Sequence, residues 1–169
     1  VPALVWLILE GFGAWAFWLF VAAVASDAAD GFLAKQFDMA TDLGRYLDPI
    51  ADKVLIVSVY LIFGYVGSLP SWLVILVVTR DSMIIGGSLL THTLGQGVQI
   101  RPLLLSKINT VAQMFLAAFV LAKMSFIQVT IFANNWVNES MIIWLIAVTT
   151  LSSGTAYLIR WSLSAPEQG

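Results

Sequence analysis

The sequence contains no cysteine and few charged residues. Without cysteine, the 169-residue chain has no disulfide, no thiolate nucleophile and no thiolate metal ligand. Charged residues make up only 11%, against roughly 25% in soluble domains. The single histidine, His92, has no second histidine with which to bind a metal, and we expect it to have no chemical role. With a net charge of −2, the chain offers no basic surface for nucleic acid.

What the chain has in excess is apolar sequence. Hydrophobic residues make up 60%, and the mean hydropathy is +0.91. Apolar runs such as Val54–Thr79 and Ser140–Ile159 contain no formal charge and reach the length of roughly 20 residues that a membrane-spanning helix needs. Helices fit this pattern better than a barrel, whose strands alternate polar and apolar residues. The sequence therefore predicts an integral membrane protein.

The turn signals divide the chain into six helices. Val1–Phe12 is too short to span a bilayer, so we expect it to be the end of a first helix whose start lies upstream. Glycines, prolines and N-caps place the other five at residues 14–35, 41–67, 70–95, 103–123 and 138–161. The prediction is an all-α polytopic membrane protein, a six-transmembrane-helix bundle with its first helix only partly present. It forms one domain over residues 1–169, with tryptophans at the membrane interfaces.

The charge that the chain does carry is concentrated. Nine of the eighteen charged residues, including six aspartates, lie between Asp27 and Lys53. Asp27 and Asp30 are three residues apart, with Gly31 close behind on the same helix face. On the next helix, Gly44, Asp48 and Asp52 recur every four residues and form a second stripe.

The two stripes belong to one helical hairpin, so they predict four carboxylates that face each other. Such a group repels itself unless cations lie between the carboxylates, and all-oxygen sites suit Mg²⁺, Mn²⁺ or Ca²⁺. Two such ions can hold a phosphate group and stabilise attacking and leaving oxygens. The remaining aspartates, Asp38 and Asp42, fall at the turn and near a helix N-terminus, where we expect a structural role.

The residues of the two stripes match the spacing of a known family signature. The pattern Asp27-x2-Asp30-Gly31-x2-Ala34-Lys35-x8-Gly44-x3-Asp48-x3-Asp52 resembles the signature of the CDP-alcohol phosphotransferase family, D-x2-D-G-x2-A-R-x8-G-x3-D-x3-D. Lys35 stands where the family usually has arginine; it keeps the positive charge and loses the bidentate fork. The six-helix interpretation agrees with the family's fold.

The resemblance implies a role for each residue of the signature. Asp27, Asp30, Asp48 and Asp52 would hold divalent cations, two Mg²⁺ or Mn²⁺ ions per site, and Asp52 would also serve as the general base. The nucleotide-binding set would be Gly31, Ala34, Lys35 and Gly44. The implied reaction is attack by an alcohol on the lipid-linked phosphorus of CDP-diacylglycerol, which forms a phosphodiester and releases CMP.

The acceptor alcohol depends on residues after the signature. Arg80-Asp81 and Pro102-x3-Ser106-Lys107-Ile108-Asn109-Thr110-x2-Gln113 resemble the branch of cardiolipin synthases of the CDP-alcohol type and phosphatidylglycerophosphate synthases, and are closer to the former. The acceptor is then phosphatidylglycerol; the alternative is glycerol 3-phosphate, whose dianionic phosphate should need more than one cation. The candidates to hold the acceptor's phosphate are Lys53, Arg80, Arg101 and Lys107.

Structural alternatives stay open for these residues. Lys53 could pair with Asp48 or Asp52, and Arg80 with Asp81 could belong to an internal ion-pair network. The polar residues Ser106, Asn109, Thr110 and Gln113 could hydrogen-bond between helices.

Two other functional classes also use intramembrane carboxylates. Cation transporters draw them from helices spread along the bundle, and metal-dependent prenyl transfer does not predict the Gly44–Asp48–Asp52 stripe. The resemblance further implies a homodimer in the bacterial inner membrane or the mitochondrial inner membrane, with its active site facing the cytoplasm or matrix.

Overall fold

The structure, a computed structural model, describes residues 1–36, 42–93, 104–126 and 139–164. Side chains are described for residues 1–27, 29–30, 53–87, 105–126 and 140–159. Within these ranges every regular element is an α-helix, as the sequence predicted: α1 (Pro2–Leu9), α2 (Gly13–Gln36), α3 (Asp42–Tyr65), α4 (Ser71–Thr93), α5 (Leu104–Ser125) and α7 (Glu139–Ser164).

The helix boundaries follow local backbone chemistry. Pro2 begins α1, where its missing N–H costs no hydrogen bond. Gly11 then turns the chain into α2 at a φ of 78°, a value that glycine adopts without strain. Gly67 does the same after α3, at a φ of 74°, while Ser68 N–H donates to Phe63 O at 2.8 Å and closes the helix end.

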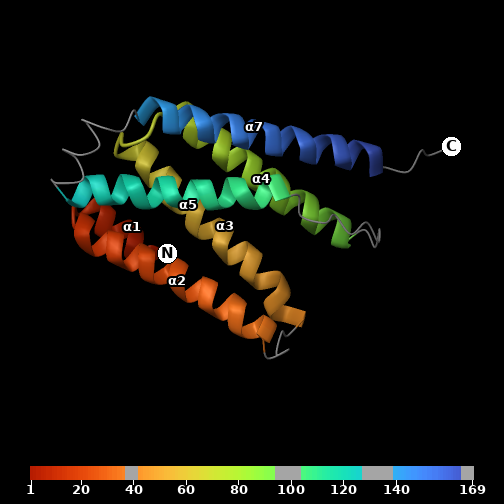
Figure 1. Cartoon of the computed structure of the whole chain (residues 1–169), viewed down its shortest axis with the longest axis horizontal. Coiled ribbons are helices and arrows are strands. Elements are labelled where there is room, and N and C mark those ends of the chain that lie inside the picture. The colour runs from red at the N-terminus through yellow and green to blue at the C-terminus, as the bar shows by residue number, and fades with distance from the viewer. Residues whose placement is uncertain (37–41, 94–103, 127–138, 165–169) are drawn as a thin grey trace.

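α5 is the central helix of the bundle. It packs against α2, α3 and α7, while α4 packs against α3 and α7. Figure 1 shows α7 running beside α4 and α5, and α1 beside the first half of α2. The apolar core lies between these helices and includes Phe20, Tyr60, Phe63, Leu73 and Leu121.

The outer surface carries many large apolar side chains. Trp15 is 70% exposed and Phe115 is 72% exposed, and further large apolar side chains are exposed on every described helix. Trp72 of α4 and Trp144 of α7 lie together on this surface, with ring centroids 5.4 Å apart. A surface of this kind is expected where helices contact lipid rather than water.

Only part of the predicted six-span bundle is confirmed. Two of the described helices are long and apolar enough to cross a membrane, over Leu105–Ser125 and Ser140–Ile159. α1 has only 8 residues, and the apolar parts of α2 and α3 shorten to Gly13–Asp27 and Lys53–Tyr65. The reason is the aspartates, which occupy the end of α2 and the start of α3; in α4, Arg80 and Asp81 interrupt the apolar run.

Close packing of α3 on α4 gives a first testable prediction. A Cβ added at Gly64 would lie 3.2 Å from Val74 Cγ2, whereas a Cβ at Gly86 meets nothing within 4 Å. Gly64→Leu should therefore destabilise the protein by about 1–3 kcal/mol through overpacking, and Gly86→Leu should not. Thermal unfolding of the purified variants in detergent tests this expectation, and equal losses at both sites would contradict it.

Candidate functional site

The signature positions lie on the ends of two consecutive helices. Positions 27–35 are helical in the last turns of α2, and positions 44–52 are helical in the first turns of α3. Five residues connect these helices, 37–41, so the two ends are held at one corner of the bundle, as Figure 1 shows. The backbone thus places the two halves of the signature on consecutive helices with a short connection, and the facing of their carboxylates stays a prediction.

Asp27 and Asp30 are the two signature carboxylates whose side chains are described. Both are exposed on α2, about one helical turn apart. Exposed carboxylates are hard oxygen donors, and this donor chemistry fits Mg²⁺ or Mn²⁺. The side chains of Gly31, Ala34, Lys35, Gly44, Asp48 and Asp52 lie outside the described residues, so the four-carboxylate site stays a prediction.

The four candidate acceptor cations fall in different surroundings. Lys107 is exposed in the first turn of α5. Arg80 is 2% exposed, and the side chain of Lys53 is 13% exposed. Arg101 lies outside the described residues. The structure therefore brings Lys53 and Arg80 together inside the bundle and leaves Lys107 on its surface.

Asp81 accepts hydrogen bonds from both Arg80, which is buried, and Lys53, which is partly buried. Its Oδ1 atom accepts hydrogen bonds from Arg80 Nη1 at 2.6 Å and from Lys53 Nζ at 2.9 Å. Asp81 is 0% exposed. The predicted ion-pair alternative for Arg80 and Asp81 is thereby confirmed, and Lys53 pairs across to α4, a partner the sequence did not suggest.

Hydrogen bonds to two further helices complete this network. Arg80 Nη2 donates to Ser106 Oγ of α5 at 2.6 Å and to Ser153 Oγ of α7, and Lys53 Nζ donates to Thr110 Oγ1 of α5 at 3.2 Å. Four helices thus share one polar cluster, formed by Lys53, Arg80, Asp81, Ser106, Thr110 and Ser153. A buried charge in an apolar bundle needs this degree of pairing, because isolated it would cost several kcal/mol.

The rest of the polar stretch on α5 also bonds between helices. Asn109 Oδ1 accepts from Thr149 Oγ1 at 2.9 Å and from Thr150 Oγ1 at 3.0 Å, both on α7. The Tyr60 hydroxyl donates to Gln113 O at 3.1 Å. The interhelical interpretation of Ser106, Asn109 and Thr110 is confirmed, whereas Gln113 takes part through its backbone carbonyl.

Sequence reasoning missed the partners on α7. Thr149, Thr150 and Ser153 are small polar residues in the middle of α7, and their spacing places them on one helix face. That pattern was the available signal, since such residues commonly hydrogen-bond across helices in membranes.

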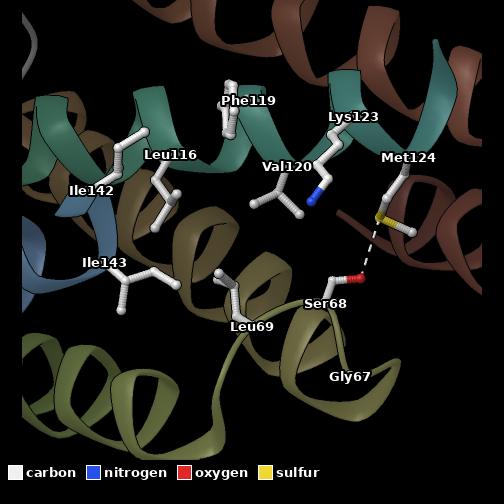
Figure 2. A pocket seen from close by; sticks show the side chains of 10 residues that line it. All are labelled: Gly67, Ser68, Leu69, Leu116, Phe119, Val120, Lys123, Met124, Ile142 and Ile143. Carbon is white, nitrogen blue, oxygen red and sulfur yellow. Dashed lines mark hydrogen bonds between the residues drawn. The ribbon is translucent and has the colours of Figure 1, made fainter. Parts of the chain in front are cut away.

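A pocket lies at the opposite end of the bundle from the aspartates. It has a volume of about 370 Å³ and is enclosed by the α3–α4 turn, the second half of α5 and the start of α7. Figure 2 shows apolar side chains on most of its wall, with the Lys123 amine directed inward and Ser68 Oγ donating to Met124 Sδ. No aspartate lines it among the described residues. Since α3 runs from the aspartates to this turn, the pocket is separate from the signature.

Comparison with known proteins agrees with the signature. The profile of the family described as CDP-alcohol phosphatidyltransferase matches residues 1–152. A chloroplastic CDP-diacylglycerol–glycerol-3-phosphate 3-phosphatidyltransferase from Oryza sativa subsp. japonica is 32% identical over 184 residues, covering 99% of this chain and 55% of that protein. The chain therefore spans about half the length of this relative.

Two further relatives carry different names. The CDP-diacylglycerol–glycerol-3-phosphate 3-phosphatidyltransferase of Bacillus subtilis (strain 168) is 30% identical over 144 residues, covering 84% of this chain and 70% of that protein. The CMP-forming cardiolipin synthase of Rattus norvegicus is 33% identical over 137 residues, covering 72% of this chain and 45% of that protein. With most of its length matched by one profile, the chain belongs to the CDP-alcohol phosphatidyltransferase family.

Proposed function

We propose that this protein transfers a phosphatidyl group from CDP-diacylglycerol to the free headgroup hydroxyl of phosphatidylglycerol, giving cardiolipin and CMP. The observation that carries the reaction class is the Asp27–Asp52 signature, which departs from the family pattern at Lys35 alone and lies on two helices joined by a short connection. The acceptor is assigned from the residues after the signature. Family membership supports the reaction class. The protein would act as a homodimer in a bacterial or mitochondrial inner membrane, with the site facing cytoplasm or matrix.

In the proposed mechanism, the acceptor hydroxyl attacks the phosphorus that carries the diacylglycerol group. The Asp52 carboxylate accepts the hydroxyl proton, the new phosphorus–oxygen bond forms, and the bond to the CMP oxygen breaks. Gly31 and Gly44 would leave room for the nucleotide, and Lys35 would contact a phosphate. Divalent cations bound by Asp27, Asp30, Asp48 and Asp52 would neutralise negative charge on the diphosphate.

The residues after the signature support phosphatidylglycerol as the acceptor. Arg80-Asp81 and the run from Pro102 to Gln113 resemble cardiolipin synthases of the CDP-alcohol type more than phosphatidylglycerophosphate synthases. The two parts of this pattern lie together in the structure, because Arg80 Nη2 donates to Ser106 Oγ at 2.6 Å.

The second candidate function is a phosphatidylglycerophosphate synthase, which uses glycerol 3-phosphate. The names of the rice and Bacillus subtilis relatives favour it, and the name of the rat relative favours cardiolipin synthesis. A cation transporter receives no support, since the family match extends over most of the chain.

An acceptor screen separates the two candidates. Purified protein with CDP-diacylglycerol and Mg²⁺ or Mn²⁺ should release CMP and form cardiolipin when labelled phosphatidylglycerol is added. Thin-layer chromatography of the labelled lipid identifies the product, and omission of the metal provides the blank. CMP release with glycerol 3-phosphate alone would overturn the acceptor assignment and leave the reaction class intact.

Replacement of the proposed base should separate chemistry from binding. Asp52→Asn should lower kcat by roughly 10²–10⁴-fold, because the amide cannot accept the hydroxyl proton. Binding of CDP-diacylglycerol to protein in nanodiscs should remain largely intact. Asp38→Asn is the matched control, since Asp38 is expected to be structural and its variant should remain active. Retained activity in Asp52→Asn would remove this residue as the base.

Lys35 offers a gain-of-affinity test. Lys35→Arg should preserve turnover and lower the KM for CDP-diacylglycerol if position 35 contacts a phosphate, because arginine restores the bidentate fork. Lys35→Met should raise that KM. Initial rates at several CDP-diacylglycerol concentrations give both values. Strong inactivation by Lys35→Arg would show that the lysine has a role of its own.

A further inference from the structure

The side chain of Lys53 joins α3 to α4 and α5. Lys53 Nζ lies 2.9 Å from Asp81 Oδ1 of α4 and 3.2 Å from Thr110 Oγ1 of α5. Asp81 is fully buried, and the Arg80 guanidinium donates to the same oxygen at 2.6 Å. One point on α3 is thus joined to two helices by directional bonds.

The Lys53–Asp81 contact lies on α3 next to the residues of the signature. Lys53 directly follows Asp52, and it is the first residue of α3 whose side chain is described. Towards the other end of the helix, Ile56, Val59 and Phe63 pack in the apolar core. Among the side chains of α3 that the structure describes, Lys53 therefore makes the interhelical contact nearest the Gly44–Asp48–Asp52 stripe.

An ion pair at this position restricts the rotation of α3 about its own axis. Successive α-helical residues differ by about 100° around the axis, so fixing residue 53 fixes the directions of positions 52, 48 and 44 as well. Apolar contacts are non-directional and tolerate small rotations. An ion pair with good hydrogen-bond geometry in a low-dielectric interior is more restrictive, and buried ionic groups serve such registry roles in some proteins.

We propose that the Lys53–Asp81 ion pair is a positioning contact, which holds α3 at the rotation that the metal-binding and base residues of the stripe require. Lys53 then acts through Asp48 and Asp52, and not by binding the phosphate of the acceptor. The inference rests on the proposed function, because it assumes that the stripe holds divalent cations.

A mutant cycle on the two partners tests the inference. Lys53→Met, Asp81→Asn and the double variant are compared with wild type in detergent. Mn²⁺ binding is measured from the EPR signal of free Mn²⁺, and kcat and the acceptor KM are measured by CMP release. Thermal unfolding reports general stability. Thr150→Val is the matched control, because Thr150 is a buried polar residue whose hydrogen bond joins α7 to Asn109 of α5.

A positioning contact predicts a specific pattern. Each single variant should weaken Mn²⁺ binding and lower kcat by about tenfold, the low end for residues that orient metal ligands. The acceptor KM should stay within about twofold of wild type. The double variant should lose no more Mn²⁺ affinity than the weaker-binding single variant, because both changes break the Lys53–Asp81 ion pair. The Arg80–Asp81 pair is also lost in Asp81→Asn, and this loss should lower the unfolding temperature. Thr150→Val should lower the unfolding temperature and leave Mn²⁺ affinity unchanged.

Three results would overturn the inference. Unchanged Mn²⁺ affinity with a raised acceptor KM would make Lys53 an acceptor ligand. An equal loss of Mn²⁺ binding in Thr150→Val would indicate general loosening of the bundle, and additive losses in the double variant would indicate two separate roles. Because Mn²⁺ binding is measured without turnover, absence of CMP release by the wild type would overturn the proposed function, and the Mn²⁺ comparison would still decide the positioning role.

Discussion

The cost of placing charge in an apolar bundle is the constraint on which this structure depends. Ionised groups are expensive in a low-dielectric interior unless they are paired. The described charges obey this rule in two ways. Arg80 and Asp81 are buried and paired with each other and with Lys53, whereas Asp27 and Asp30 are exposed at the end of α2. The charges that stabilise the bundle are thus separated from those that remain accessible to a metal or a substrate.

The same constraint explains how the helices recognise one another. Lipid tails are as apolar as leucine, so burial of leucine gives little preference for one helix arrangement over another in a membrane. Specific association needs close approach and hydrogen bonds. Gly64 allows close approach of α3 and α4, because it leaves space for the side chain of Val74. Hydrogen bonds join α7 to α5 through Thr150 and Asn109, and join α7 to α4 through Ser153 and Arg80.

The sequence predicted the helix boundaries, which depend on neighbouring residues, but it did not predict which side chains pair between distant helices. The predicted starts of α2, α3 and α4 fall within a residue or so of those observed, because glycine turns, Asp42 and Pro70 act on their immediate neighbours. The six-span prediction exceeded what the structure supports, since α1 is short and the aspartates interrupt the apolar parts of α2 and α3. The partner of Lys53 is 28 residues away on another helix, a pairing that no local pattern specifies. Of the candidate site, the signature and its placement on two consecutive helices were predictable, while the burial of Arg80 beside Asp81 required the packed bundle.

Selection of the acceptor must depend on residues outside the signature. A pattern that identifies a whole family of phosphotransferases cannot also distinguish one alcohol from another, and the relatives of this chain carry names for two acceptors. Those acceptors differ in the charge of their phosphate, so the discriminating feature should be a local balance of cations and carboxylates. Asp81 accepts from both Lys53 and Arg80 in the polar cluster of α3, α4, α5 and α7, so these two cations are already engaged inside the bundle. Lys107 is the candidate cation that the structure describes as exposed, in the first turn of α5. With Lys53 assigned to positioning α3, a cation at the bundle surface is better placed to distinguish a singly charged phosphate from a dianionic one.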